Sequence, residues 1–146
     1  MASIVEQTVE IDRPVDEVFA YVDDYSRVKD WMYGLHKMEP RTEQVNGVGA
    51  TFDGIMKLGV SLSSRIRCTG WEQGRLIEMT SIKGIKNTQR WTFTDLGEGR
   101  TRVEAHITYE LPGGPAGKAM AVAVKPVIGI AVKHSSEKLV ENLTVG

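Results

Sequence analysis

The sequence has few of the residues from which catalytic and metal sites are most often built. Its 146 residues contain one cysteine, Cys68, and three histidines far apart from one another, His36, His106 and His134. One cysteine cannot form an intramolecular disulfide or a cysteine-based zinc cluster. The histidines show no HxxxH or HExxH spacing, so the sequence predicts no metal site and no cofactor.

Strong charge and long apolar runs are also missing. The formal net charge of −1 gives no basic field that would attract phosphate groups, which argues against nucleic acid as a partner. No apolar run reaches the roughly 18 residues of a membrane-spanning helix, so no integral membrane segment is predicted. The N-terminus opens directly into a strand pattern and lacks the apolar stretch of a signal peptide. Together these absences predict a cytoplasmic protein.

The remaining composition is that of an ordinary globular protein. Hydrophobic residues make up 41% of the chain and charged residues 25%, which is the usual balance for a folded domain. The length suits one hydrophobic core, so we predict a single domain over residues 1–146. The sequence leaves open whether the protein is a monomer or a homodimer.

Strand patterns recur from residue 3 to residue 111. Residues 3–11 alternate between apolar and polar side chains, as a half-buried strand does. Pro14 and the acidic turn after it favour a short helix over residues 14–22, and a second short helix over residues 25–31 has Asp24 as its candidate cap. Further strands are predicted at residues 35–42, 51–58, 61–71, 75–81, 87–94 and 102–111, with turns at 46–49, 59–60, 83–84 and 95–99.

The last part of the chain predicts one long helix. Residues 116–143 are rich in Ala, Val and Ile, and Pro126 and Gly129 interrupt the pattern, with a kink expected at Pro126. The closely spaced strands before it have turn-length connections, which favours an antiparallel meander. The predicted fold class is α+β with a helix-grip fold. In it, a seven-stranded curved antiparallel sheet surrounds a long C-terminal helix, and two short helices follow the first strand.

Four local patterns carry a family resemblance. They are IDRPVDEVF at 11–19, DDY at 23–25 followed by Trp31, WTF at 91–93 with GRTRV at 99–103, and YELPGGPAG at 109–117. In order and spacing they cover nearly the whole chain. They resemble the superfamily of START, polyketide-cyclase and birch-pollen-allergen-like (SRPBCC) proteins, above all its small bacterial members of the polyketide cyclase/dehydrase type.

The resemblance implies a ligand cavity between the long helix and the sheet. Members of the superfamily bind lipids, sterols, quinones, plant hormones or polyketides, and some of them catalyse a reaction. We therefore predict binding, transport or sequestration of a small hydrophobic ligand such as a lipid, quinone or polyketide. One alternative is a polyketide cyclase/dehydratase-type enzyme, which is less favoured because no inward-facing His, Asp or Glu is identified and no catalytic residue is predicted. Another alternative is an accessory protein with a closed core that acts through its surface.

Alternation along the strands and helical spacing select the residues that would line this cavity. The register of the fifth strand, residues 75–81, stays open by one residue. The predicted ligand-binding residues on the strands are Phe52, Met56, Leu62, Ser64, Ile66, Met79, Gln89, Trp91, Phe93, Ala105, Ile107 and Tyr109, and those on the helix are Met120, Val124, Val127, Ile128, Ala131 and Ser135.

The polar positions allow two interpretations each. A buried Gln89 amide must find hydrogen-bond partners, either on a ligand or on a neighbouring side chain or water. Tyr109 either belongs to the core or points its hydroxyl at the mouth of the cavity. Asp23 and Asp24 are either a pair of carboxylates with a chemical role or capping residues at the helix boundary, and we favour capping. The glycine pairs at 47–49, 97–99 and 113–114 do not form a phosphate-binding loop.

Overall fold

The structure, a computed structural model, describes residues 2–144. Every predicted strand and helix is present, with boundaries that differ from the predicted ones by a few residues. The elements are β1 (Ser3–Ile11), α1 (Val15–Asp23), the 3-10 helix η1 (Tyr25–Asp30), β2 (Leu35–Pro40), β3 (Thr51–Lys57), β4 (Ser61–Glu72), β5 (Leu76–Gly84), β6 (Lys86–Gly97), β7 (Arg100–Glu110) and α2 (Gly114–Thr144).

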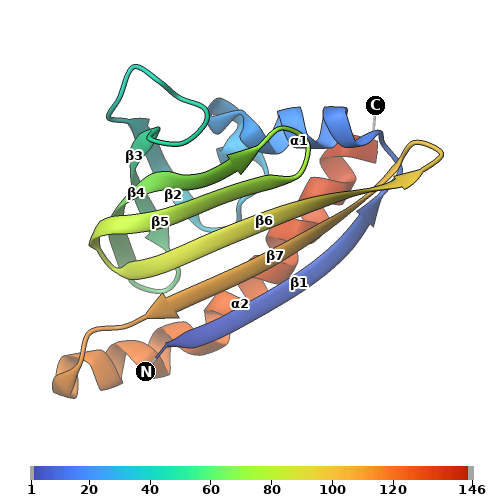
Figure 1. The fold of residues 1–146 in the computed structure, drawn as a ribbon. Helices are drawn as coiled ribbons and strands as arrows, with labels where there is room; N and C mark the ends of the chain where they lie inside the picture. The colour runs from blue at the N-terminus through green and yellow to red at the C-terminus, as the bar shows by residue number, and fades with distance from the viewer. Residues whose placement is uncertain (1, 145–146) are drawn as a thin grey trace.

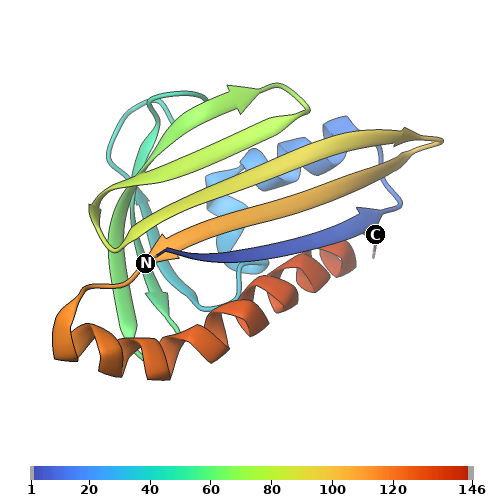
Figure 2. The same ribbon diagram turned by 60° about the horizontal axis from the view of Figure 1, so that its bottom comes forward.

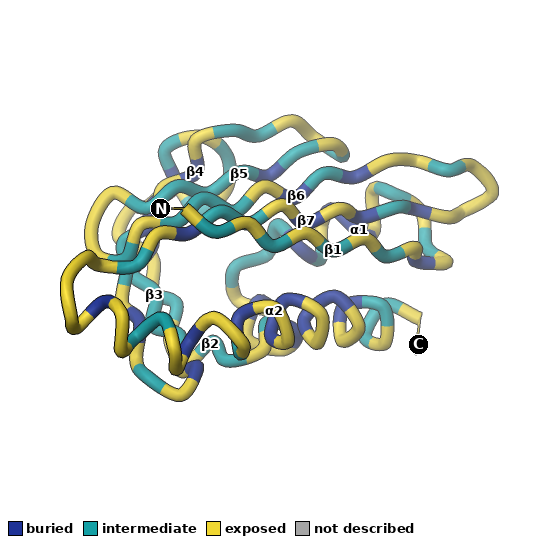
Figure 3. Tube along the Cα trace, turned by 90° about the horizontal axis from the view of Figure 1, so that it is seen from below, coloured by how far each residue is buried: buried dark blue, intermediate teal, exposed yellow. Residues whose placement is uncertain are grey.

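The seven strands form one antiparallel sheet in the order β1-β7-β6-β5-β4-β3-β2. Register shifts between β2 and β3, and at two places between β4 and β5, add the local twist that curls a sheet. α2 lies across the open side of the curled sheet (Figures 1 and 2). The same arrangement is seen from below in Figure 3. The predicted α+β helix-grip fold is therefore confirmed.

The hairpin between β6 and β7 is tighter than the sequence suggests. The predicted turn at 95–99 is wrong in length, because β6 continues to Gly97, which pairs with Arg100. The loop consists of Glu98 and Gly99, both with positive φ angles of 56° and 71°. This two-residue geometry matches the natural twist of the flanking strands, so the ladder continues almost to the tip of the hairpin.

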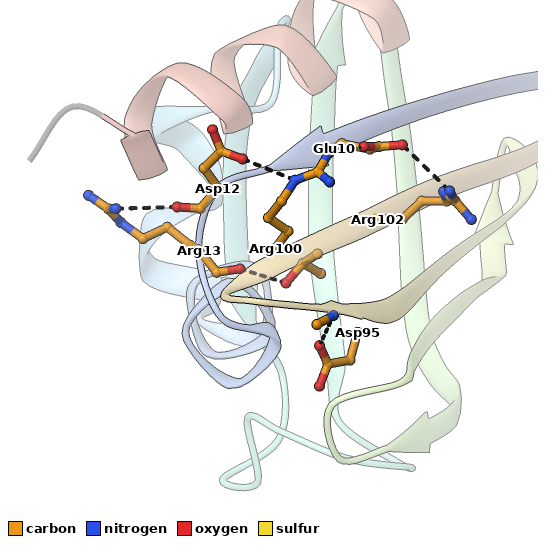
Figure 4. Close-up of polar contacts among 8 residues, drawn as sticks. Glu10, Asp12, Arg13, Asp95, Arg100 and Arg102 are labelled. Atoms are coloured by element: carbon orange, nitrogen blue, oxygen red, sulfur yellow. Dashed lines mark hydrogen bonds and ion pairs between the residues drawn. The ribbon is translucent and has the colours of Figure 1, made fainter.

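Charged and hydroxyl side chains join β1 to the β6–β7 hairpin (Figure 4). Glu10 on β1 pairs with Arg100, and its second oxygen lies 3.5 Å from Arg102. Thr101 is fully buried and donates a hydrogen bond from its hydroxyl to the carbonyl oxygen of Arg13 at 2.7 Å. Exposed ion pairs contribute little to stability, so the buried hydrogen bond of Thr101 contributes more to the stability of this end of the sheet than the ion pairs do.

Aromatic contacts hold α1 against the inner face of the sheet. Phe19 is buried, and its ring meets Phe93 and Trp71 edge-on at centroid distances of 5.1 and 5.7 Å. Asp24 then starts η1 by accepting a hydrogen bond from the backbone N–H of Ser26 at 3.0 Å. The predicted cap at Asp24 is therefore confirmed.

α2 begins two residues before its predicted start and continues through Pro126. Its first turn packs closely on the preceding loop, because a Cβ atom at Gly117 would lie 1.5 Å from the carbonyl oxygen of Pro112. Figure 2 shows α2 bending between its orange and red parts. A bend is expected where proline removes a helix hydrogen bond and crowds the preceding turn.

One side of α2 belongs to the core. Val124, Ile128, Ala131 and Leu139 are buried, and they share one hydrophobic cluster with the inward-facing residues of the sheet. By length and composition α2 could also cross a membrane, a test that the core helix of a globular protein also passes. Its packing against the sheet identifies it as the core helix.

Candidate functional site

The space between the sheet and the elements covering it is not filled. Two neighbouring hollows of about 100 and 120 Å³ lie there, each with room for several water molecules. We call them the η1 hollow, which is walled partly by α1 and η1, and the α2 hollow, which is walled partly by α2. Both are lined by Met32, Met56, Ser64, Gln89 and Trp91.

The η1 hollow lies between the η1 region and β3 to β6. The strands contribute mainly every second residue, because successive side chains point to opposite faces of a sheet. The wall is mostly apolar, with a carboxylate, an amide and a thiol at separate points. Besides the shared residues it consists of Val22, Asp23, Tyr25, Val28, Trp31, Leu35, Met38, Val45, Asn46, Gly47, Ala50, Phe52, Gly54, Ile66, Cys68, Ile77 and Met79.

The α2 hollow lies between α2 and the ends of β3, β4, β6 and β7. Its wall is also mostly apolar and includes two tyrosines. Besides the shared residues it consists of Tyr33, Leu58, Leu62, Ile85, Asn87, Ile107, Tyr109, Leu111, Ile128, Ala131, Val132 and Ser135.

Most of the residues predicted to line a cavity lie in these walls. Met79 faces inward, which resolves the register of β5 that the sequence left open. The predicted residues that line a hollow are Phe52, Met56, Leu62, Ser64, Ile66, Met79, Gln89, Trp91, Ile107, Tyr109, Ile128, Ala131 and Ser135.

The other predicted residues, Phe93, Ala105, Met120, Val124 and Val127, line neither hollow. Phe93 is covered by Phe19 of α1, and Ala105 and Val124 are buried in the closed part of the core. Among the strands, α2 makes most of its contacts with β1. Met120 and Val127 are partly buried and pack against the same core outside the two hollows.

Sequence patterns did not indicate that η1 and the residues after it would form a wall. Val28, Trp31, Met32 and Leu35 line the η1 hollow, although their spacing is also that of an ordinary core-facing segment. A sequence pattern identifies an apolar face, but it does not reveal whether the opposite surface touches that face or leaves a gap.

Several polar groups in the walls have no protein partner. The indole N–H of Trp31 is buried without a hydrogen bond. Within the described residues, the hydroxyls of Ser64 and Tyr109 also have no hydrogen-bond partner. The Nε2 of Gln89 donates one long hydrogen bond of 3.4 Å to the Oδ1 of Asn87, and no described residue donates a hydrogen bond to the Gln89 carbonyl oxygen. These groups could form hydrogen bonds with a bound molecule.

Ser135 has a structural partner, unlike the other serine in the wall. Its hydroxyl accepts a hydrogen bond from the backbone N–H of Tyr33 at 2.8 Å and donates one to the carbonyl oxygen of Ala131 at 2.7 Å. The ring of Tyr33 stacks on His134 with a centroid distance of 5.5 Å. These contacts fasten the loop before β2 to α2 at the wall of the α2 hollow.

Replacing Ser135 with alanine is expected to lower the free energy of unfolding by about 1–2 kcal/mol, because the Tyr33 N–H then loses its partner. Ser136→Ala is the matched control, since the equally buried Ser136 hydroxyl donates only to Val132 within the same helix. Its effect should stay below about 0.5 kcal/mol. Urea unfolding of both variants measures the difference, and equal losses would contradict the proposed tie between the loop and α2.

Asp23 places a carboxylate in the wall of the η1 hollow. Its Oδ1 accepts a hydrogen bond from the indole N–H of Trp71 at 3.1 Å, and its backbone carbonyl accepts one from the amide of Asn46 at 2.8 Å. Burial raises the pKa of Asp23, and hydrogen bonds from Trp71 and Asn46 oppose this rise. The capping interpretation was therefore wrong for Asp23, because the side chain turns inward and leaves the cap to Asp24.

Cys68 lies in the same wall, but its thiol is not activated as a nucleophile. Its thiol donates a weak hydrogen bond to the carbonyl oxygen of Gly70 at 3.4 Å. Burial raises the pKa of this thiol above its usual value. Since the thiolate is the reactive form of cysteine, Cys68 is unsuited to act as a nucleophile here.

The raised pKa of Asp23 predicts a pH-dependent stability difference. Because the folded state holds the Asp23 proton more tightly than the unfolded chain does, the stability contributed by this group is present below its ordinary pKa of 3.8 and is lost as the pH rises through its folded value. Asp23→Asn should therefore gain stability relative to the wild type as the pH increases from about 3 to about 7. Urea unfolding over this pH range measures the trend.

Trp71→Phe provides the comparison for this prediction. The substitution keeps an aromatic ring beside Phe19 but removes the N–H that lowers the pKa of Asp23. The loss of stability with rising pH should become steeper in this variant. A wild type and an Asp23→Asn variant that respond identically to pH would rule out an unfavourable Asp23 charge.

Among the described residues, no group of three or more His, Cys, Asp or Glu side chains is placed to hold a metal ion. His106 is exposed on the outer face of β7, and His134 is exposed on α2. The chemistry that the walls offer is therefore apolar burial, a few hydrogen bonds and one carboxylate.

Comparison with known proteins agrees with this picture at the level of the family. Residues 2–144 match the family described as polyketide cyclase / dehydrase and lipid transport. The sequence matches no curated protein.

Solved structures share the fold at low sequence identity. The protein TTHA0849 from Thermus thermophilus is 19% identical in sequence. Its match covers 97% of this chain and 97% of that chain, with a TM-score of 0.81. The Zhui aromatase/cyclase from a Streptomyces species is 13% identical, with 98% of this chain and 94% of that chain covered and a TM-score of 0.84. A START superfamily protein from Mycobacterium smegmatis is 16% identical, covers 96% of each chain and has a TM-score of 0.76.

Proposed function

The chain belongs to the polyketide cyclase / dehydrase and lipid transport family, and from that premise and the geometry of the hollows we propose that it binds one small, largely apolar molecule. The observation that supports this proposal is the pair of adjacent hollows, whose walls are mostly apolar but include polar groups without hydrogen-bond partners. This combination is typical of small-molecule sites. Binding draws its free energy mainly from apolar burial, at about 25 cal/mol per Å² removed from water.

The bound molecule would occupy both hollows. The side chains common to the two walls include Met32 and Met56, and methionine side chains adapt easily to a new neighbour. A shift of these two side chains would join the hollows into one larger site. The proposed ligand is therefore longer than either hollow alone could accept, in the manner of a lipid, quinone or polyketide.

Polar groups would set the orientation of the ligand. Gln89 and Ser64 lie where the two hollows meet, and Tyr109 lies in the wall of the α2 hollow. A ligand with a hydroxyl or carbonyl group near its middle could bond the Gln89 amide and the Ser64 hydroxyl together. We assign these residues an orienting role and the apolar wall residues the burial role.

Native mass spectrometry of gently purified protein tests this proposal directly. The expected result is a stoichiometric complex with a small molecule, which is then extracted and weighed. A panel of apolar fluorescent probes provides a second measurement on protein freed of its ligand. Empty protein that also binds none of the probes would overturn the binding proposal.

An enzymatic function of the cyclase or dehydratase type is the second candidate, and Asp23 is the observation that favours it. A carboxyl group with a raised pKa in a cavity wall can accept or donate a proton. In that case Asp23→Asn would abolish turnover of a bound polyketide-like substrate while its affinity changes little. Retained turnover in this variant would remove Asp23 from any catalytic role. The cytoplasmic location remains a prediction. The choice between monomer and homodimer remains open.

A further inference from the structure

The first half of α2 leaves an apolar face uncovered. Ala119, Val122, Pro126 and Ile130 follow one another at helical spacing and are all exposed, with Val122 80% and Ile130 53% accessible. Only 28% of the most apolar stretch of α2 is buried. In Figure 3 much of the trace of α2 is yellow, the colour of exposed residues. We call these four residues the α2 stripe.

The charged residues on this stretch of α2 have one sign. Lys118, Lys125 and Lys133 are exposed on the same stretch of helix, and the sequence contains no Asp or Glu between Leu111 and Ser136. Lys118 and Lys125 are two helical turns apart, so both lie along the same side of the stripe. The protein as a whole carries a charge of only −1, so this cationic segment is a local feature.

We propose that the α2 stripe and its lysines dock on the surface of an anionic lipid bilayer. A helix with apolar side chains flanked by lysines lies in the interface of such a bilayer, with the apolar groups among the lipid chains and the lysines beside anionic headgroups. The opposite side of α2 remains packed on the sheet through Val124 and Ile128. The protein would therefore bind peripherally as a folded unit, and α2 would not cross the bilayer.

A bilayer docked on the stripe would lie across α2 from the α2 hollow, because α2 forms part of the wall of that hollow. Ile128 and Leu111 line that hollow and come from α2 and from the segment just before it. The charges also disfavour the obvious competing occupant, because a second copy of the chain would bring its own lysines against these lysines. This inference does not rest on the proposed ligand, since an empty protein could dock in the same way.

Vesicle co-sedimentation tests the proposal. Wild-type protein is expected to sediment with vesicles of phosphatidylcholine containing roughly a third phosphatidylglycerol, to bind pure phosphatidylcholine much more weakly, and to dissociate as salt is added. The double variant Lys118→Gln/Lys125→Gln should bind the anionic vesicles roughly 30-fold more weakly, because each lysine contributes about 1 kcal/mol near such a surface. Val122→Asn should weaken binding about fivefold to tenfold.

Matched controls come from exposed residues elsewhere. Lys29→Gln removes a lysine from η1, and Val48→Asn removes a side chain that is 60% accessible in the loop before β3. Both should bind vesicles like the wild type. The proposal would be overturned if the wild-type protein does not bind anionic vesicles. It would also be overturned if the stripe variants bind these vesicles as well as the control variants do. A wild-type dimer in sedimentation equilibrium that becomes a monomer on Val122→Asn would also overturn it, by assigning the stripe to a second copy.

Discussion

Ser64→Phe is expected to weaken binding of the apolar ligand about a hundredfold or more. Ser64 lies in the wall of both hollows, so a phenyl ring at this position would occupy the volume that the ligand needs. The stability should change by less than about 1.5 kcal/mol, because the ring enters empty space and displaces few packed side chains. Titration with a fluorescent apolar probe measures the affinity, and urea unfolding measures the stability.

Ser63→Phe is the matched control for this substitution. Ser63 is the preceding residue on β4, and its side chain is exposed on the outer face of the sheet. The same chemical change there should leave probe affinity unaltered. If Ser64→Phe folds normally and binds the probe like the wild type, the hollows are not the binding site.

Phe19→Ala is expected to cost about 3–5 kcal/mol of stability, the largest effect of any single substitution considered. Phe19 is 1% accessible, and its ring makes edge-on contacts with Phe93 and Trp71. Removing it creates a cavity under α1 and also ends both aromatic contacts. Because a domain of this kind has a total stability of about 5–15 kcal/mol, the variant should unfold at much lower urea concentration.

An exposed apolar residue gives the comparison for Phe19. Ile82 is 47% accessible at the end of β5, and Ile82→Ala should change stability by less than about 0.5 kcal/mol. A loss at Phe19 no larger than the loss at Ile82 would contradict the role assigned to the α1 contacts. The position of α1 also matters for the site, since Val22 and Asp23 at its end line the η1 hollow.

Much of the site followed from sequence patterns, and the reason is periodicity. Gln89, Ile107 and Tyr109 face the interior because alternate residues of a strand share a face. Ile128, Ala131 and Ser135 face the sheet because they recur at helical spacing. Phe93 and Val124 recur with the same periodicity but lie in the tightly packed part of the core. Periodicity identifies the inner face of a strand or helix, but it does not reveal where another element packs tightly on that face.

Asp23 and Ser135 illustrate what no pattern supplies. The contact from Asp23 to Trp71 joins α1 to β4, and the contact from Ser135 to Tyr33 spans most of the chain. Such partners are chosen by the way distant elements pack, so the sequence suggested a cap at Asp23 and only a wall position at Ser135.

Sequence patterns were sufficient to predict the strands, the three helices, the antiparallel pairing and the inner faces, because hydrophobic periodicity and turn chemistry act over a few residues. The packing of distant elements established how far α2 and η1 stand from the sheet, and thus where the two hollows lie. It also left the outer side of α2 uncovered. Gaps and uncovered faces depend on packing between remote surfaces, and local sequence patterns carry no information about that distance.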